Sequence, residues 1–229
     1  MVRRNKRAVI LVSGGLDSCV AGTIAKCEGY EIYALTIDYG QRHAKEIEAA
    51  ANVAKALRAK EHKTVQVDLS ALGGSALTDP DIEVPTDREA GEMEGEIPVT
   101  YVPARNTVFL SIALGYAETI EAQAVFIGAN AVDYSGYPDC RPEYIEKFDE
   151  LAALATKQGV EGKPTKVHAP LIEWTKGRIV QEGLNLKAPI KFTWSCYLGG
   201  DKQCGRCDSC RLRLKGFQEA GVEDPVPYE

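Results

Sequence analysis

The chain has 229 residues, a length that fits one domain with a small appendage and buries a sizeable core. Hydrophobic residues make up 45% and charged residues 26%, as is ordinary for a globular protein. The net charge of −6 argues against a general affinity for nucleic acid. No apolar run is long enough to span a membrane, and the run behind the basic N-terminus is too short for a signal peptide. We therefore expect a cytoplasmic protein that binds no membrane.

The N-terminal segment is typical of a strand, a glycine turn and a helix. Residues 7–12 form a short apolar run, as in a buried parallel strand, and residues 19–25 are compatible with a helix. Between them stands Ser-Gly-Gly-Leu-Asp-Ser, residues 13–18. Such a turn offers free backbone N–H groups and the positive end of a helix dipole to an anion. The segment therefore predicts a phosphate-binding loop.

This loop lacks the lysine of a Walker A motif and is similar to the PP-loop of the ATP pyrophosphatase superfamily. That resemblance implies a loop that cradles the phosphates of ATP and typically serves adenylation. Asp17 is unusual beside a phosphate unless it acts through Mg²⁺ or an oriented amide. The alternative is a glycine-rich turn of the kind that any α/β protein needs.

Strands and helices alternate along the rest of the chain. A strand over 31–39, an amphipathic helix over 43–58 and a strand over 64–69 follow the loop. This order predicts an α/β fold with a doubly wound, mostly parallel five-stranded sheet, whose ligands bind beyond the carboxyl ends of the strands. The remaining predicted elements are a helix over 106–121, a strand over 124–130, a helix over 142–158, a strand over 167–171 and a helix over 175–185.

Residues 70–100 interrupt this alternation. They contain three prolines, two consecutive glycines and an acidic run over 79–96, without a visible period. A loop of this length in a compact domain is usually functional or mobile. We expect an exposed excursion whose acidic side chains are solvated rather than bound to metal.

Four of the seven cysteines gather near the C-terminus with the spacing C-x7-C-x2-C-x2-C. In a cytosolic protein such a cluster favours metal over disulfides. We predict a structural zinc site with four thiolate ligands; the alternatives are an iron–sulfur cluster and four buried free thiols without metal. The site would stabilise a small zinc-binding lobe of residues 192–229, packed on a nucleotide-binding domain of residues 1–191. The predicted ligands are Cys196, Cys204, Cys207 and Cys210.

Charged side chains also follow the other predicted strands. Asp38 at the end of the second strand and Arg42 just after it could frame a nucleotide. Arg105 precedes the helix over 106–121 and could clamp a phosphate or a carboxylate, the alternative being a solvated arginine beside a capping Asn106. Lys176 could serve phosphates, although a solvated helix face is the interpretation we prefer there.

The segment after the fourth predicted strand is rich in carboxylates and aromatic rings. Asp133 could accept two N–H donors from a guanine-like edge, and Tyr134 or Tyr137 could stack on a planar heterocycle. Asp139 and Arg141 are further candidates for substrate binding. The alternative is a polar loop in front of a helix that begins with proline.

Five segments occur in this order: S-G-G-L-D-S, D-Y-G-Q-R-H, P-A-R-N-T-V-F-L, D-Y-S-G-Y-P-D-C-R-P-E and the cysteine motif. Together they resemble the 7-cyano-7-deazaguanine synthase family from residue 8 to about residue 217, with no clear match in the acidic run over 79–96. The resemblance implies an adenine nucleotide alpha hydrolase-like fold, a homodimer, and ATP, Mg²⁺ and structural zinc. It also implies a ligase that converts 7-carboxy-7-deazaguanine and ammonia to the 7-nitrile, a precursor of queuosine or archaeosine.

The implied reaction explains which residue types the site needs. A carboxylate is a poor electrophile until a nucleotidyl or phosphoryl group gives it a leaving group, which ammonia then displaces to form an amide. A nitrile requires loss of a second oxygen, so a second activation is plausible. Such a site mainly positions reactants and stabilises phosphate charge.

On this basis the candidate catalytic residues are Ser13, Asp17, Ser18 and Arg105. The candidate ATP-binding residues are Val12, Ser13, Gly14, Gly15, Leu16, Asp17, Ser18, Cys19, Asp38 and Arg42. The candidate substrate-binding residues are Arg105, Asp133, Tyr134, Tyr137, Asp139 and Arg141.

Two other interpretations stay open from the sequence. One is another PP-loop enzyme, either an amidating synthetase or a tRNA-thiolating enzyme, the latter with Cys140 as the candidate reactive thiol. The other is a non-enzymatic, nucleotide-sensing module with a zinc ribbon. The basic residues that favour such a module are Lys202, Arg206, Arg211, Arg213 and Lys215.

Overall fold

The computed structural model describes residues 6–88, 97–132 and 136–229. Its centre is a parallel sheet with the strand order β3-β2-β1-β4-β5. The chain starts in the middle of this sheet and winds outward in both directions, which confirms the predicted doubly wound topology. The strands are β1 (Arg7–Leu11), β2 (Glu31–Asp38), β3 (Glu61–Gln66), β4 (Ala124–Phe126) and β5 (Lys166–His168).

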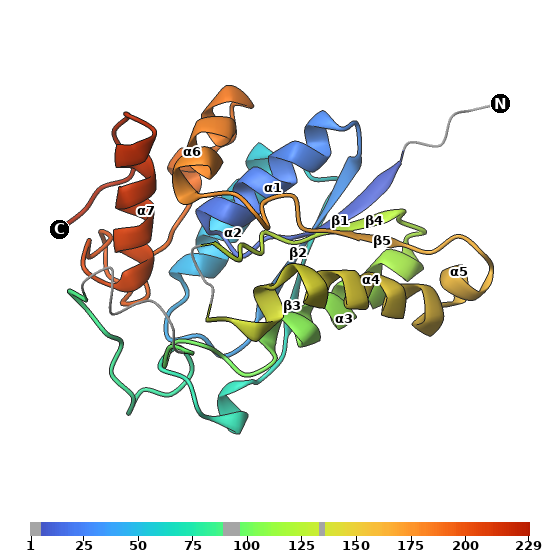
Figure 1. Ribbon diagram of the computed structural model, residues 1–229, viewed down its shortest axis with the longest axis horizontal. Coiled ribbons are helices and arrows are strands. Elements are labelled where there is room, and N and C mark those ends of the chain that lie inside the picture. Colours follow the sequence, from blue (N-terminus) through green and yellow to red (C-terminus); the bar gives the residue numbers. More distant parts are fainter. Residues whose placement is uncertain (1–5, 89–96, 133–135) are drawn as a thin grey trace.

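Helices cover both faces of the sheet, as Figure 1 shows. In the described part of the chain, no helix has both the length and the apolar character needed to span a membrane. The α-helices are α1 (Leu16–Cys27), α2 (Lys45–Ala56), α3 (Arg105–Thr119), α4 (Pro142–Ala155), α5 (Lys157–Val160), α6 (Lys176–Asn185) and α7 (Asp208–Glu219). Short 3₁₀ turns are η1 (Ser70–Leu72), η3 (Pro138–Cys140) and η4 (Ile190–Phe192).

The central strand β1 is buried on both faces because its side chains alternate between two hydrophobic layers. Ala8 and Ile10 pack with α1 and α2 on one face. Val9 and Leu11 pack with α3 and α4 on the other face. This burial explains why the residues of β1 after Arg7 are all apolar. Because β1 is the central strand, its carboxyl end lies at the middle of the sheet edge.

Some predicted boundaries were wrong. Strand β3 begins at Glu61 rather than at residue 64, because it is an edge strand whose exposed first residues carry no apolar signal. Strand β4 ends at Phe126 rather than at residue 130, and β5 ends at His168 rather than at 171. The helix over 142–158 is divided at Thr156, whose extended backbone ends α4 and whose hydroxyl accepts a hydrogen bond from the Gly159 amide to cap α5.

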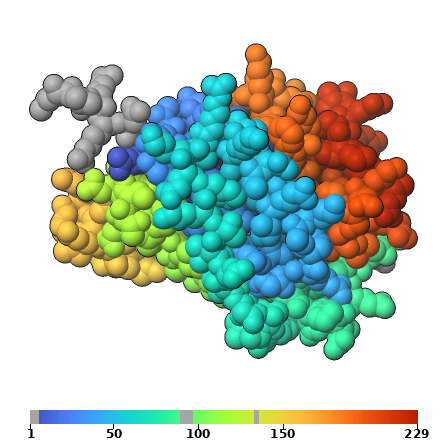
Figure 2. All heavy atoms as spheres, turned by 180° about the vertical axis from the view of Figure 1, so that it is seen from behind, coloured from blue at the N-terminus to red at the C-terminus, as the bar shows by residue number. Residues whose placement is uncertain are grey.

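The C-terminal segment packs closely on the sheet domain. Helix α7, which we did not predict because its sequence is strongly polar, lies beside α6 through Phe217, Ile179 and Val180. Upstream of it, the Trp194 amide donates to the Gly14 carbonyl at 2.9 Å. Seen from behind in Figure 2, C-terminal atoms lie directly against those of the N-terminal half. The boundary between residues 191 and 192 stays a prediction.

The segment before residue 89 is not simply the exposed excursion that we expected. Ala76 and Val84 are buried against the cysteine cluster. Thr86 forms an antiparallel bridge with Cys207, and Arg88 is ion-paired with Asp208. These contacts cover one side of the cysteine cluster with a segment more than a hundred residues away in sequence. Residues 89–96, the rest of the acidic run, lie outside the described residues.

Gly128 is required where the chain leaves β4 and passes the start of α1. A Cβ atom at this position would lie 2.7 Å from the Ser18 nitrogen and 2.8 Å from the Asp17 carbonyl carbon. Backbone atoms cannot yield as a flexible side chain can. The two segments therefore approach each other this closely only with glycine here.

We expect Gly128→Ala to lower the free energy of unfolding by about 1–3 kcal/mol, because the added methyl group overpacks this crossing. Urea denaturation measures the effect. The control is Gly115→Ala in α3, where a Cβ meets no atom within 4 Å and alanine favours the helix. Equal stability of the two variants would contradict the steric argument.

Candidate functional site

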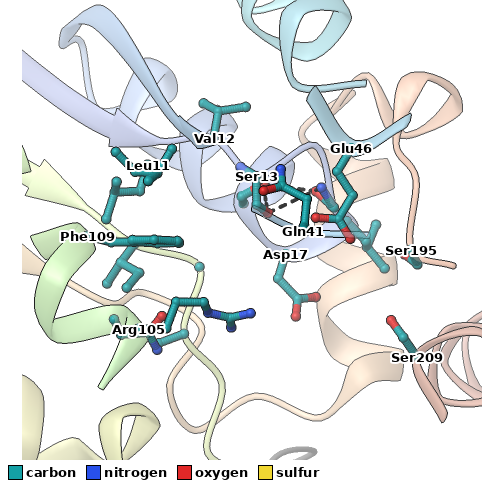
Figure 3. A pocket seen from close by; sticks show the side chains of 18 of the residues that line it. Leu11, Val12, Ser13, Asp17, Gln41, Glu46, Arg105, Phe109, Ser195 and Ser209 are labelled. Atoms are coloured by element: carbon teal, nitrogen blue, oxygen red, sulfur yellow. Dashed lines mark hydrogen bonds between the residues drawn. The ribbon is translucent and has the colours of Figure 1, made fainter. Parts of the chain in front are cut away.

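A cavity opens at the carboxyl edge of the sheet, where β1, β2 and β4 end. The loop over 13–18, the segment after β2, the start of α3 and the exit of β4 all contribute to its wall. Residues 194, 195 and 197 of the C-terminal segment complete it. Figure 3 shows side chains from these separate segments pointing into a common space. The cavity therefore lies where parallel α/β sheets bind ligands.

The predicted phosphate loop has the expected strand–turn–helix geometry. The Ser18 hydroxyl donates to the Gly15 carbonyl and accepts from the Ser13 amide, at 3.1 Å and 3.2 Å. Gly15 is the N-cap of α1 and provides no side-chain cap, so first-turn amides of α1 are available to a ligand. Gly14 has φ +82°, and a Cβ there would lie 2.4 Å from the Glu46 carbonyl oxygen.

Asp17 is paired with Lys176. The Lys176 ammonium lies 2.9 Å and 2.8 Å from the two carboxylate oxygens of Asp17, and Lys176 is only 5% exposed. Our preferred interpretation of Lys176 as part of a solvated helix face was therefore wrong. The first residue of α6 instead brings a positive charge to the phosphate loop across 159 positions of sequence. This pairing explains how an aspartate is tolerated beside a site that favours anions.

Arg105 points into the cavity from the first residue of α3 (Figure 3). Its guanidinium carbon lies 5.7 Å from the centre of the Tyr39 ring and 5.9 Å from that of Phe109. Contact with two aromatic faces holds the guanidinium group without neutralising its charge. Leu11 and Ile127 extend this side of the cavity as an apolar surface. The arrangement suits an anionic group attached to a flat, apolar ring system.

Other predicted substrate residues lie in different places. Tyr137 lines the cavity, with its hydroxyl 2.9 Å from that of Thr100. Asp139 is buried and accepts a hydrogen bond from the Asn106 amide at 2.9 Å, so it caps α3 in place of the Asn106 side chain. Arg141 is exposed at the N-cap of α4, outside the cavity lining.

Asp133 and Tyr134 lie outside the described residues, so their roles stay predictions.

The predicted nucleotide residues Asp38, at the end of β2, and Arg42, after it, do not line the cavity. Asp38 accepts a hydrogen bond from Gln66, and the Arg42 guanidinium donates to the Pro80 carbonyl at 2.8 Å. Their neighbours Tyr39 and Gln41 take that place. The segment therefore reaches the cavity through other residues than those predicted, because the turn after β2 sets the direction of its side chains.

Two cysteines near the loop differ in their surroundings. Cys19 is fully buried in the hydrophobic layer between β1 and α2, where it packs as a small apolar residue. Cys140 lines the cavity, and burial raises the pKa of its thiol to about 11. Because the thiolate is the reactive form, this environment does not favour the nucleophile that a tRNA-thiolating enzyme needs.

Sequence reasoning overlooked Glu46. It lies in the first turn of α2, and in Figure 3 its carboxyl group points into the cavity. Burial raises the pKa of Glu46 to about 7, although the charge of Arg105 opposes the shift. The signal in the sequence is weak: an acidic residue three positions after D-Y-G-Q-R-H, at the start of an amphipathic helix.

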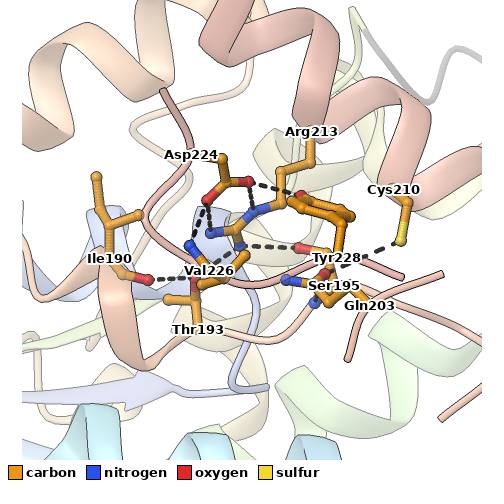
Figure 4. Close-up of polar contacts among 9 residues, drawn as sticks. All are labelled: Ile190, Thr193, Ser195, Gln203, Cys210, Arg213, Asp224, Val226 and Tyr228. Atoms are coloured by element: carbon orange, nitrogen blue, oxygen red, sulfur yellow. Dashed lines mark hydrogen bonds and ion pairs between the residues drawn. The ribbon is translucent and has the colours of Figure 1, made fainter. Parts of the chain in front are cut away.

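Arg213 was wrongly grouped with the exposed basic residues of the C-terminal segment. It is 1% exposed, and its guanidinium group binds both carboxylate oxygens of Asp224, at 2.6 Å and 2.9 Å (Figure 4). It also donates to the hydroxyls of Thr193 and Ser195, while Tyr228 donates to Asp224. The network ties α7, the C-terminal tail and the wall of the cavity together, which weakens the case for a nucleic-acid surface.

The four predicted metal ligands form one buried cluster. Their sulfur atoms all lie within 4.8 Å of one another, and all four cysteines are free of disulfides. The distance between Cys204 Sγ and Cys210 Sγ is 3.9 Å, close to the ~3.8 Å edge of a tetrahedron with zinc–sulfur bonds of about 2.3 Å. Backbone amides, including those of Leu198 and Arg206, donate to the sulfurs and favour thiolates. The cluster could hold a metal ion.

Comparisons of the sequence with known proteins point to one family. The family model described as "Queuosine biosynthesis protein QueC" matches residues 7–221. A 7-cyano-7-deazaguanine synthase of Saccharophagus degradans is 62% identical over 226 residues, covering 98% of each chain. One of Nostoc sp. is 55% identical over 222 residues, covering 97% of each chain.

Among solved structures, NMN synthetase from Francisella tularensis matches with a TM-score of 0.50 and 16% identity, covering 96% of this chain and 79% of the other. At this identity the likeness concerns the fold alone. It agrees with the adenine nucleotide alpha hydrolase-like architecture expected from the motifs.

We expect Arg213→Met to lower the free energy of unfolding by about 3–5 kcal/mol, because Asp224 would keep a buried charge without its partner. Chemical denaturation measures this. The control, Lys215→Met on the same helix, removes an exposed pair with Glu219 and should cost less than about 0.5 kcal/mol. Similar losses in both variants would show that the buried network contributes little.

Proposed function

Since the chain is an enzyme of the QueC family of queuosine biosynthesis proteins, we propose that it converts 7-carboxy-7-deazaguanine, ammonia and ATP to 7-cyano-7-deazaguanine. We assign it to the ATP-dependent ligases that form C–N bonds. The observation that supports this most is the position of Arg105. Its guanidinium group lies in the same cavity as the loop over 13–18 and beside apolar side chains, where it could bind a carboxylate attached to a heterocycle.

In this proposal the loop over 13–18 binds the phosphates of ATP. The amides at the start of α1 and the hydroxyls of Ser13 and Ser18 would donate to phosphate oxygens. Lys176 would add positive charge while it keeps Asp17 in place. Mg²⁺ bound with ATP would offset more of the phosphate charge. Asp17, which belongs to the loop itself, is the carboxylate that could help to hold the ion.

Arg105 would bind the carboxylate of 7-carboxy-7-deazaguanine and direct it toward the phosphate loop. The heterocycle would lie against the apolar surface near Phe109, with Tyr137 as a stacking or positioning residue. Asp139, which caps α3, would act indirectly by fixing the start of the helix that carries Arg105. Asp133, Tyr134 and Arg141 stay candidates for the guanine-like edge and the rim.

The chemistry would proceed through two activations. Transfer of a nucleotidyl or phosphoryl group to the carboxylate creates a leaving group, and ammonia displaces it to give the amide. A second transfer to the amide oxygen then allows that oxygen to depart and leaves the nitrile. The contribution of the protein is to align these groups and to stabilise negative charge on the phosphates.

We further propose that Cys196, Cys204, Cys207 and Cys210 bind a structural zinc ion. The buried cluster offers four sulfurs and is enclosed by Val84 and Tyr228. Zinc would join α7 to the segment that forms the cavity wall, and it would have no position open for substrate. Cytoplasmic location and assembly as a homodimer complete the proposal, and light scattering on the purified protein tests the homodimer.

The reaction is tested by incubating the protein with ATP, ammonium chloride and 7-carboxy-7-deazaguanine, followed by mass spectrometry. We expect the amide and the nitrile, with release of AMP or ADP. Lys176→Met should reduce turnover by about 100-fold or more, because it removes a charge from the phosphate site and leaves Asp17 unpaired. The control is Lys187→Met, an exposed lysine after α6. Absence of both products from the wild-type reaction would refute the assignment.

The zinc proposal is tested by elemental analysis of the purified protein. We expect about one zinc ion per chain, and Cys207→Ser should lose zinc and unfold at a lower temperature. Cys27→Ser, which changes an exposed cysteine outside the cluster, should keep both. Iron in place of zinc would favour the alternative cluster, and absence of any metal would contradict both.

A further inference from the structure

Glu46 lines the cavity but binds neither ATP nor the deazaguanine in the proposed reaction. It extends from the first turn of α2 toward the space that Arg105 and Asp17 also face (Figure 3). The backbone of the same residue packs against the phosphate loop, where its carbonyl oxygen excludes a Cβ at Gly14. The position of Glu46 is therefore tied directly to that of the loop.

Asp17 and Glu46 are the carboxylates among the described residues that line the cavity, and their surroundings differ. Asp17 is paired through both oxygens with Lys176. The Glu46 carboxyl group has neither a hydrogen bond nor an ion pair with any residue that the structure describes. A cavity-facing carboxylate without a protein partner is suited to a cation or a hydrogen-bond donor from a ligand.

This inference rests on the proposed function, in which the nitrogen source must lose a proton before it can react. At neutral pH the nitrogen source is almost entirely ammonium, which has no lone pair with which to attack a carbon atom. Among the other groups that line the cavity, burial raises the pKa of the Cys140 thiol and of the Tyr39 and Tyr137 hydroxyls, so these stay protonated. Because Asp17 is paired with Lys176, Glu46 is the group left to accept a proton among the described residues that line the cavity.

We propose that Glu46 binds the ammonium ion and takes the proton that it must lose before its nitrogen attacks the activated carboxylate. The negative carboxylate attracts the cation, and Arg105 on another side of the cavity holds the substrate carboxylate that becomes the electrophile. Glu46 thereby acts as a catalytic residue that sets the affinity for the nitrogen source. A pKa of about 7 suits a group that gains and loses a proton near neutral pH.

Ammonium transfers one proton to the Glu46 carboxylate, and the nitrogen lone pair that is freed forms the C–N bond. The bond between the carbonyl carbon and the oxygen of the activating phosphate breaks, and its electron pair leaves with that phosphate. The nitrogen then loses its second proton to the departing phosphate, which yields the neutral amide. Glu46 returns its proton to solvent before the next ammonium binds.

The test compares Glu46→Gln with Glu48→Gln, which changes an exposed carboxylate in the same helical turn and controls for the helix dipole. Amide and nitrile formation are measured against ammonium concentration. We expect Glu46→Gln to lower kcat/KM for ammonium by about 100-fold, with little change in KM for ATP. Glu48→Gln should match the wild-type protein.

Hydroxylamine separates proton removal from activation, because it is mostly the free base at neutral pH and needs no general base to become a nucleophile. We expect Glu46→Gln to form the hydroxamate from 7-carboxy-7-deazaguanine and ATP at close to the wild-type rate. Glu46→Asp is measured as well, in case the glutamine variant folds poorly. It should keep hydroxamate formation and lose part of the ammonium-dependent rate.

Three results would overturn the inference. One is an unchanged kcat/KM for ammonium in Glu46→Gln. Another is a result that places Glu46 at the nucleotide. It would be either an equal loss of rate with hydroxylamine and with ammonium, or a raised KM for ATP alone. The third is a wild-type protein that forms neither amide nor hydroxamate, which refutes the proposed function and this role with it.

Discussion

The site depends on how closely three backbone segments meet at the start of α1. The phosphate loop leaves β1, passes against the first turn of α2 at Gly14 and lies under the exit of β4 at Gly128. At both positions a single methyl group would collide with backbone atoms. The loop therefore has little freedom to change shape, and its amides are held ready for an anion.

The charges around the cavity are distributed as the proposed reaction between two anions and a cation would need. Lys176 and Arg105 provide positive charge at separate places, which in the proposed function would serve the phosphates and a carboxylate. Asp17 is neutralised by its partner, whereas Glu46 keeps its acceptor atoms open to the cavity. Like charges on the reactants can thus approach each other, because each meets an opposite charge on the protein.

The C-terminal segment belongs to the site rather than merely following it. Arg213 holds Asp224 and the hydroxyls of Thr193 and Ser195 in one buried network, and Trp194 donates to the phosphate loop. The cysteine cluster is part of the same C-terminal segment. Loss of order in this region would therefore disturb the phosphate loop, although Trp194 and Gly14 are about 180 positions apart in sequence.

The sequence by itself determined the parallel α/β fold, and it predicted a phosphate loop, a set of cysteine ligands and a role for Arg105, because short-range patterns carry each of these signals. The apolar run of β1, the glycines after it and the cysteine spacing are all readable locally. Only the tertiary structure decided that Lys176 pairs with Asp17, that Asp139 caps α3, that Arg213 is buried and that Glu46 faces the cavity. The physical reason is that burial and pairing of a charge depend on neighbours distant in sequence, which no local pattern specifies.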